Sequence, residues 1–306
     1  MKNSGIILSI LLLASNAFSG EPVADTIALQ DHVNYLCGLY PPRNIDHPLS
    51  LYHAAQYIEK ELKLSSNSVE TQNYSVEEGE VSNIIVSFGP ETGPRIIIGA
   101  HYDVAGNQPG ADDNASSVAG LLELARMLSS FLGDIKKRID LVAYTLEEPP
   151  YFGTEKMGSF IHAQSLWDNH IEVDYMISLE MIGYYSDSSD SQSYPVPLMK
   201  YFYPQKGNFI ALVSNLASRH KCGSIRDSMQ NNCDINIIKV SLPSFITGID
   251  LSDHRNYWHF GYKALMITDT AFYRNRNYHD KNDLPETLNF PKMAEVVNGV
   301  FYTITH

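Results

Sequence analysis

The segment from Ile98 to Glu123 most constrains the fold, because it joins an apolar strand to an apolar helix through a loop rich in turns and acids. The strand delivers His101 and Asp103, and the loop carries Asp112 and Asp113. Residues two apart in a strand point the same way, so Asp103 can accept a hydrogen bond from the imidazole nitrogen that a metal leaves free. Two adjacent carboxylates repel unless they are hydrogen bonded or neutralised, which a divalent cation does best. The segment therefore predicts a metal site, although a loop acid could instead cap the helix.

The first residues have the features of a secretory signal peptide. Lys2 precedes an apolar run at 6–14, and small residues at 17–19 provide a cleavage site. The run is too short to span a bilayer, and no later run reaches its length. We therefore expect residues 1–19 to be removed and residues 20–306 to be exported as a periplasmic or secreted protein.

The charge and the length limit the partners and the architecture. The chain has 306 residues and a formal net charge of −13. This acidic balance argues against nucleic acid and anionic membranes as partners. The length suits one α/β domain with an ample core, and we expect a monomer.

Three cysteines, Cys37, Cys222 and Cys233, allow three single pairings in an exported protein. We expect a disulfide between Cys222 and Cys233, closing a loop rich in Asn, Gln and Ser, with Cys37 left as a buried thiol. None of the three belongs to a C-x-x-C pattern, so zinc ligation by thiolates is not expected.

Helical and strand patterns alternate along the chain. This alternation, with several fully apolar strands, predicts a single α/β domain whose largely parallel sheet is covered by helices on both faces. The run at 186–193 is typical of a mobile surface loop. The expected helices are 24–40, 49–64, 116–131, 154–167, 208–220 and 291–302, and the expected strands are 69–74, 81–88, 95–100, 139–144, 175–180, 235–240 and 264–268.

Ligands of such sheets bind beyond the carboxyl ends of the strands, and further acids and a histidine follow predicted strands here. Glu147 and Glu148 follow one strand, Glu180 ends another, and His279 lies in a loop after a third. Each alone has an ordinary explanation as a solvated turn, a strand end or a surface histidine. Together with His101 and the loop acids they predict a metal site. Nitrogen and carboxylate ligands suit zinc, with manganese or cobalt possible, and five ligands suggest two ions bridged by a carboxylate.

This series resembles the co-catalytic zinc aminopeptidases of the leucyl aminopeptidase and aminopeptidase Y type, within the clan MH metallopeptidases. The resemblance covers nearly the whole mature chain and implies one phosphorylase/hydrolase-like α/β domain, at 20–306, with a central mixed eight-stranded sheet. It also implies a cis peptide between Asp113 and Asn114. The matching motifs are His101-Tyr-Asp103, Gly110-Ala-Asp-Asp113-Asn-Ala-Ser, Glu147-Glu148, Leu179-Glu180-Met-Ile-Gly and Tyr278-His279.

Carried over by position, the resemblance implies two zinc sites. His101 and Glu180 would hold one zinc, Glu148 and His279 would hold the other, and Asp113 would bridge them. Many members of the family carry Asp where this chain has Glu180, a departure that leaves the ligand geometry of this position open.

The resemblance also implies roles around the metals. Glu147 would be the general base, Tyr278 would help to stabilise the tetrahedral intermediate, and Asp103 would orient His101. Three further residues would line or support the site or fix a loop beside it: Asp253, His254 and Asp269.

The function implied is hydrolysis of N-terminal residues from peptides with a free N-terminus, by a water that two zinc ions activate. A glutaminyl cyclase, which resembles this family but uses one zinc, and a carboxypeptidase of the wider family are alternatives. Ser252-Asp253-His254 suggests a serine hydrolase, but no G-x-S-x-G elbow is present. A binding protein on a degraded peptidase fold is disfavoured because every ligand position is filled.

Overall fold

The computed structural model describes residues 20–306, so the expected signal peptide at 1–19 lies outside the described residues. Eight strands form one mixed sheet in the order β1-β2-β4-β3-β5-β8-β6-β7. The central strands β4, β3, β5 and β8 are parallel, whereas β2 is antiparallel to β4 and β6 to β8. The strands are β1 (Val69–Val76), β2 (Gly79–Phe88), β3 (Arg95–His101), β4 (Arg138–Tyr144), β5 (Val173–Glu180), β6 (Phe209–Ser214), β7 (Asn236–Ser241) and β8 (Ala264–Thr268).

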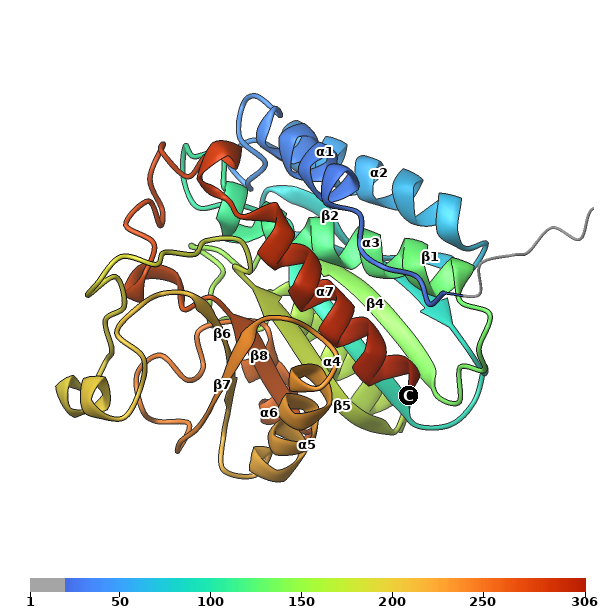
Figure 1. The fold of residues 1–306 in the computed structure, drawn as a ribbon. Coiled ribbons are helices and arrows are strands. Elements are labelled where there is room, and N and C mark those ends of the chain that lie inside the picture. Colours follow the sequence, from blue (N-terminus) through green and yellow to red (C-terminus); the bar gives the residue numbers. More distant parts are fainter. Residues whose placement is uncertain (1–19) are drawn as a thin grey trace, which may run out of the picture.

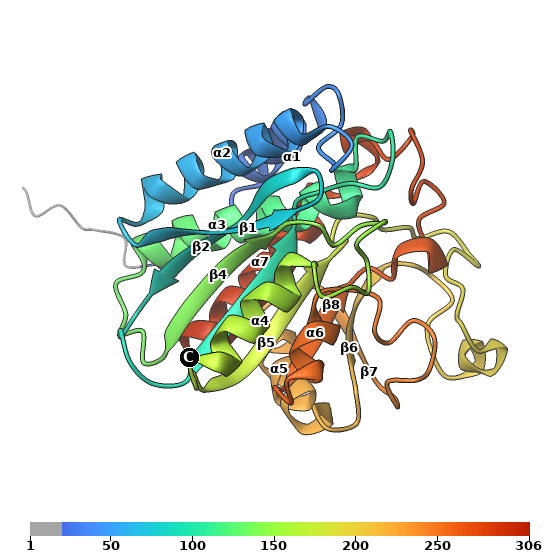
Figure 2. The same cartoon turned by 180° about the vertical axis from the view of Figure 1, so that it is seen from behind.

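Helices cover both faces of the sheet (Figures 1 and 2). One face carries α1 (Thr26–Cys37), α2 (Pro48–Ser65), α3 (Ser117–Ser130), α5 (Arg219–Gln230) and α7 (Phe290–Thr305), and the other carries α4 (Gly158–Asp168) and α6 (His254–His259). The apolar residues of β3 alternate between the two layers, since Ile96 and Ile98 belong to the larger core and Ile97 to the smaller one. The expected single-domain α/β fold is therefore confirmed.

One predicted helix is wrong. The stretch 208–220 forms strand β6 and a turn, and the helix α5 begins only at Arg219. All six residues of β6 are buried, so the strand reads as a continuous apolar run, and periodicity cannot separate such a run from a buried helix. The eighth strand, which the resemblance implied and the residue patterns missed, is this one.

The expected disulfide between Cys222 and Cys233 is also wrong, because all three cysteines are free thiols. Cys222 lies on α5, which continues to Gln230, so eight helical residues alone carry the chain roughly 12 Å along the helix axis. Cys233 lies three residues beyond the end of this helix. The Sγ of Cys222 faces the carbonyl of Leu212, whereas Cys233 packs beside Gly299 of α7.

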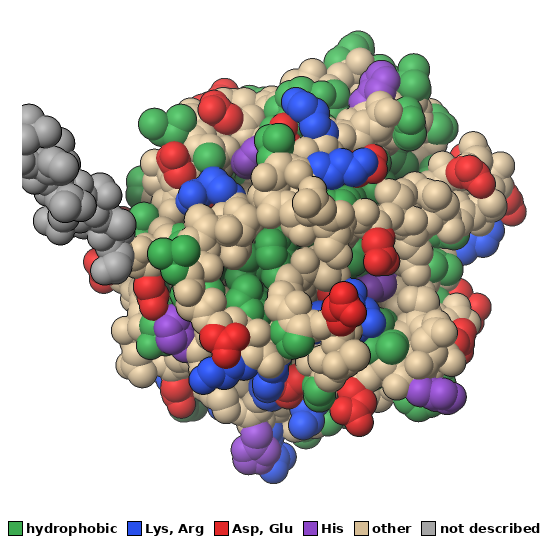
Figure 3. Space-filling model, turned by 90° about the vertical axis from the view of Figure 1, so that its right-hand side faces the viewer, with side chains coloured by type: hydrophobic (Ala, Val, Ile, Leu, Met, Phe, Trp, Pro, Cys, Tyr) green, Lys and Arg blue, Asp and Glu red, His purple; other side chains and the backbone are tan. Residues whose placement is uncertain are grey.

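The face of the molecule drawn in Figure 3 has no extended basic patch. In Figure 3, acidic and basic side chains are interspersed and do not gather into one charged patch. Among residues 20–306, no helix is both long enough and apolar enough to cross a membrane.

Candidate metal centre

The expected ligands meet at the carboxyl ends of the parallel strands. His101 is the last residue of β3 and Glu180 the last of β5, while Glu148 follows β4 after a short turn. His279 arrives on the loop after β8, and Asp113 lies in the turn of π-helix before α3. The sheet therefore brings together residues that are nearly 180 positions apart in the chain, as the parallel topology predicts.

Left-handed backbone occurs beside three of these positions. Leu146, which precedes the Glu147-Glu148 pair, has φ of 57°, Met181 after Glu180 has 52°, and His279 itself has 55°. Non-glycine residues seldom adopt this conformation, and such strain persists only where the surrounding structure enforces it. The backbone of these three segments thus turns sharply at the site.

Two of the three groups of donor atoms share Asp113, and the third joins His101, Glu147 and Glu148. His101 Nε2 lies 3.4 Å from Asp113 Oδ1 and 3.4 Å from Glu180 Oε2. His279 Nε2 lies 3.2 Å from Asp113 Oδ2 and 3.3 Å from Glu148 Oε2. Within each set the donor atoms are all within 4.8 Å of one another. The two oxygens of Asp113 thus face different sets, and this is the arrangement of a carboxylate that bridges two cations.

Burial makes a cation the best partner for these groups. The Nε2 of His101, Oδ1 of Asp113 and Oε1 of Glu148 are buried without a hydrogen-bond partner. Unpaired polar atoms in such a setting are costly unless they bind a metal. The residues present therefore fit a pair of divalent cations, and their nitrogen and oxygen donors without thiolate suit zinc.

The pKa values of the acids also favour a bound cation. Burial raises the pKa of Glu148 to about 8, with the charge of Asp113 adding to the effect. Burial also raises the pKa of Glu147 well above its usual value, and the charges of Glu180 and Glu148 reinforce this rise. Burial acts on Asp113 in the same direction, but the two histidines outweigh it and hold its pKa below the usual value. Without cations these acids compete for protons, so positive charge from another source would stabilise their ionised forms.

Asp103 supports more of the site than the sequence indicated. Its Oδ1 lies 3.5 Å from Nδ1 of His101, the nitrogen that faces away from the other donors. Its two oxygens also accept hydrogen bonds from the backbone N–H groups of Glu147 and Glu148, at 3.1 and 3.0 Å. One carboxylate thus ties the end of β3 to the turn after β4.

Asn114 ties the bridging turn to β5. Its side chain donates to the carbonyl of Leu179 at 3.0 Å and accepts from the N–H of Met181 at 2.9 Å, so it clasps the backbone on both sides of Glu180. The expected cis peptide between Asp113 and Asn114 is present. Asp112, the other acid of the pair, belongs to neither ligand set and instead accepts from Gly183 and Asn275.

Two supporting residues were missed in the sequence. Asp283 is fully buried and accepts hydrogen bonds from the backbone N–H groups of Asp112 and Asp113, at 3.0 to 3.2 Å. Arg43 is buried as well, and it donates to the carbonyls of Tyr102 and Gly110 on either side of the loop. Neither residue lies in a pattern that distinguishes it from surface Asp or Arg, so no sequence signal could have found them.

The Ser252-Asp253-His254 stretch lies beneath Glu180. Ser252, which the sequence analysis did not assign to the site, donates its hydroxyl to Glu180 Oε2 at 2.7 Å. Asp253 is fully buried, and its carboxyl has no hydrogen-bond partner. His254 donates to the carbonyl of Ile249, and burial lowers its pKa to about 4, so it stays neutral. No nucleophile is assembled here.

The remaining predicted residues border the site. Tyr278 stacks on the ring of His279, with centroids 3.8 Å apart. Asp269 lies further out, where it accepts from the N–H groups of Tyr184 and Ala271 and so shapes the loop after β8. Asp269 therefore joins the loop after β5 to the loop after β8.

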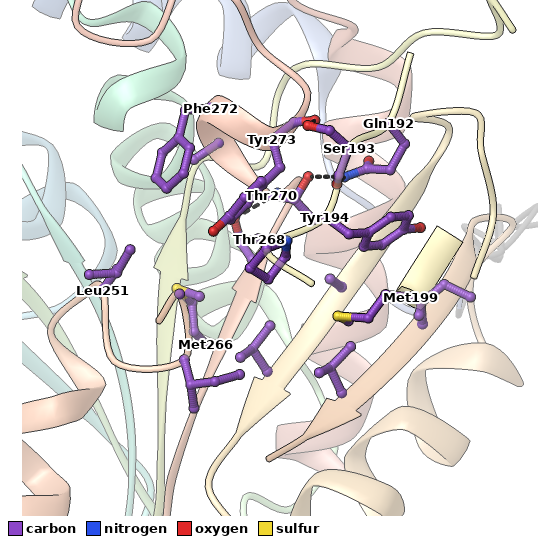
Figure 4. A pocket seen from close by; sticks show the side chains of 18 of the residues that line it. Gln192, Ser193, Tyr194, Met199, Leu251, Met266, Thr268, Thr270, Phe272 and Tyr273 are labelled. Carbon is purple, nitrogen blue, oxygen red and sulfur yellow. Dashed lines mark hydrogen bonds between the residues drawn. The ribbon is translucent and has the colours of Figure 1, made fainter. Parts of the chain in front are cut away.

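An apolar cavity of about 100 Å³ adjoins the donor atoms, because Glu180 and Tyr278 are among its lining residues. Its walls come from β6, β7, β8 and the loops after β5 and β8, as Figure 4 shows for part of the lining. Phe209, Met266 and Met199 contribute apolar surface, and no lysine or arginine of the described chain lines it. Apolar side chains of medium size fit such a space.

A domain of this topology, with two nitrogen and carboxylate sets sharing one acid at the strand ends, is similar in fold to a Zn-dependent exopeptidase from Parabacteroides distasonis. The model of peptidase family M28 matches residues 83–304, and the chain belongs to that family. The resemblance to zinc aminopeptidases found in the sequence is thereby confirmed.

The relatives that are similar in sequence include a bacterial protein and fungal leucine aminopeptidases. The chain is 44% identical over 280 residues to the uncharacterized protein YfbL of Escherichia coli K12, covering 89% of this chain and 85% of that protein. It is 22% identical over 265 residues to leucine aminopeptidase 1 of Ajellomyces capsulatus, covering 81% of this chain. The match spans 63% of the length of that fungal relative.

Solved structures show the same fold. LapB from Legionella pneumophila superposes with a TM-score of 0.73 at 21% identity, covering 92% of this chain and 71% of that one. Glutaminyl cyclase from Porphyromonas gingivalis gives a TM-score of 0.68 at 17% identity, covering 92% and 98%. At these identities the likeness shows the fold and leaves the reaction open.

Asp283→Asn tests the support of the bridging turn. The substitution places an amide N–H₂ against backbone N–H groups that need acceptors, and an unpaired buried donor costs about 1–3 kcal/mol. We expect a melting temperature lower by roughly 2–4 °C for each kcal/mol lost. Zinc affinity in equilibrium dialysis should fall by about tenfold or more. Asp168→Asn, at the exposed last residue of α4, is the control and should change neither value. Unchanged zinc affinity in Asp283→Asn would contradict this role.

Proposed function

We propose that this chain is an exported zinc aminopeptidase that removes N-terminal residues from peptides. The observation that carries the proposal is the pair of buried donor sets that share Asp113, with the carboxylate of Glu147 beside them. Family membership supports peptidase chemistry, and the two-metal mechanism is our inference from the donor atoms.

The donor sets divide between two zinc ions. His101 and Glu180 would hold one and Glu148 and His279 the other, with one oxygen of Asp113 for each. Manganese or cobalt could replace zinc, since both accept nitrogen and carboxylate ligands. Glutamate at position 180 is compatible with this arrangement, because its Oε2 already lies as close to His101 as the Asp113 oxygen does.

The protein residues then act on water and on the leaving group. When bound, two zinc ions acidify a water and polarise the scissile carbonyl. Glu147 belongs to neither set that shares Asp113, and its Oε2 lies 3.9 Å from Nε2 of His101. It is the carboxylate beside the two sets that would accept a proton from the attacking water and pass it to the departing amine. We infer that Tyr278, whose ring stacks on His279, donates its hydroxyl to the developing oxyanion.

The surroundings favour a peptide N-terminus over a C-terminus. The adjoining cavity offers apolar walls without a lysine or arginine among its described lining, so it presents no cationic side chain to a terminal carboxylate. A carboxypeptidase would need a cation there for the terminal carboxylate. We therefore infer that the first side chain of the peptide enters the cavity and that apolar residues such as leucine are preferred.

A glutaminyl cyclase is the second candidate, because a protein of that activity shares the fold. Cyclisation of N-terminal glutamine needs no water and, by the family resemblance, one zinc. The presence of both donor sets, including His279 and Glu148, favours the hydrolase.

Two peptides that differ only in an N-terminal Leu or Gln separate these activities by mass spectrometry. We expect stepwise loss of N-terminal residues, faster for Leu, and a rate reduction of about 10²–10⁴-fold in Glu147→Gln because the base is lost. Glu155→Gln, an exposed acid of the following loop, is the matched control. Loss of ammonia from the Gln peptide without cleavage would make the protein a cyclase. Cleavage of an N-acetylated peptide from its other end would make it a carboxypeptidase.

Zinc content tests the two-metal arrangement. Protein freed of loosely bound metal should retain two zinc ions per chain by elemental analysis. His279→Ala should retain about one, because one donor set loses its histidine while the other stays intact. His220→Ala, on the exposed side of α5, is the control and should retain two. One ion in the unmodified protein would contradict the bridging role of Asp113.

Export is tested by the mass of the mature protein. In the producing cell the protein should be recovered outside the cytoplasm with the mass of residues 20–306. Alkylation in denaturant without a reducing agent should modify three cysteines, since all three thiols are free. A full-length cytoplasmic protein would refute export. A single modified cysteine would show that the other two form a disulfide.

A further inference from the structure

We propose that Arg274 is a positioning residue that sets the selectivity for the first side chain of the peptide without touching the substrate. The inference rests on the proposed aminopeptidase function. Arg274 lies behind the wall of the apolar cavity, in the loop after β8, and is 5% exposed. It is absent from the cavity lining, yet its neighbours form part of that lining.

The guanidinium of Arg274 joins the loop after β5 to the floor of the cavity. Its Nε donates to Oε1 of Gln192 at 2.9 Å, and its Nη1 donates to the carbonyl of Tyr184 at 3.2 Å. Its central carbon lies 4.6 Å from the centroid of the Phe209 ring. Phe209 also lines the cavity, so this packing supports the ring from behind. A planar cation with several donors is needed to stack and to form these bonds together.

Gln192 connects Arg274 to Thr270, which lines the cavity. The sequence pattern at 186–193 predicted a mobile surface loop, but the side chain of Gln192 is buried, at 7% exposed. Its Nε2 donates to Oγ1 of Thr270 at 2.8 Å, a bond visible in Figure 4. Its backbone N–H donates to the carbonyl of Gln205 at 3.1 Å. The bond between Gln192 and Gln205 holds the two ends of the segment 192–205 together, and these two ends are called its base below.

The closed segment carries part of the cavity wall. Tyr194, Pro195 and Met199 line the cavity from this segment, while Leu198, Tyr201 and Phe202 are exposed on it. The outer part of the segment therefore has few buried contacts of its own, and its position depends on its base. We infer that the wall formed by Met199 and Tyr194 stays in place because Arg274 and Gln192 hold that base.

Close packing at Gly207 shows how tightly the base is fitted. A Cβ at Gly207 would lie 2.7 Å from Cδ and Nε of Arg274, closer than real side chains approach. The returning end of the segment thus lies directly against the arginine. Substitution of Arg274 removes this surface as well as the hydrogen bonds, so the wall should shift outward and the cavity should widen.

The test compares Leu, Phe and Ala 4-nitroanilides with Arg274→Lys, which keeps the charge but loses the planar donor group. For Leu and Phe we expect KM to rise by about tenfold, because their side chains rely on the wall for contact. For Ala we expect a change of less than about threefold, because a methyl group makes little use of the cavity. The kcat for all three should stay within about threefold. Arg226→Lys on α5, away from the cavity, should behave as the unmodified protein.

A second pair of variants keeps the test valid if Arg274→Lys folds poorly. Gln192→Leu removes the acceptor for Arg274 and should also raise KM for Leu and Phe selectively. Gln192→Glu retains that acceptor but loses the Nε2 donor to Thr270 and to the carbonyl of Ser193, so it should raise KM for Leu and Phe less than Gln192→Leu does. An equal loss of kcat/KM for all three substrates, together with a lower melting temperature, would show a purely structural role and overturn the inference. Inactivity of the unmodified protein toward all three would overturn the proposed function itself, and the inference with it.

Discussion

The carboxylate of Asp113 is the constraint on which the rest of the site depends. Each of its oxygens faces a different histidine, His101 on one side and His279 on the other, and the distances of 3.4 and 3.2 Å leave room for a cation between the donors of each set. A carboxylate can serve two sets only when its plane is fixed. The backbone beneath it is therefore held by Asp283, and the following residue, Asn114, clasps the chain around Glu180. The position of one side chain thus depends on three segments that are distant in sequence.

The parallel sheet explains why such distant segments can meet with this accuracy. β4, β3, β5 and β8 all end at one edge: His101 and Glu180 are the last residues of β3 and β5, whereas Glu148 and His279 lie in the loops after β4 and β8. Hydrogen bonds between the segments, such as those from Asp103 to the N–H groups of Glu147 and Glu148, fix the turns relative to one another. The acids would repel each other strongly without this framework. The hydrogen-bonded framework therefore fixes the positions of the acids, and bound cations would offset their mutual repulsion.

Much of the fold and the meeting of the candidate donor residues could be predicted from the sequence, for reasons that also explain the failures. His101, Glu148 and Glu180 each lie at or just after the end of an apolar strand, and it was their joint occurrence that pointed to one site. β6 was mistaken for a helix because it is buried on both faces and therefore lacks the alternation that marks a strand.

The supporting residues were harder to predict, since their role depends on tertiary contacts. Asp283 and Arg43 act on backbone groups far away in sequence, and nothing in their neighbourhood along the chain distinguishes them. The disulfide failed for a related reason: the spacing of Cys222 and Cys233 is short in sequence, but a helix holds them apart in space. Separation along the chain predicts proximity only where the intervening conformation is known.

The position of the apolar cavity links the chemistry to the choice of substrate. Glu180 contributes one oxygen to a donor set and also lines the cavity, and its other restraint is the hydroxyl of Ser252. Tyr278 likewise stacks on a ligand histidine while facing the cavity. We infer that an apolar first side chain would enter the cavity while the peptide amine lies beside the donor sets. An acidic first side chain would find no lysine or arginine in the described lining, and a basic one would find only Glu180. The adjacency of these two unlike surfaces is the basis of the proposed selectivity for an apolar N-terminal residue.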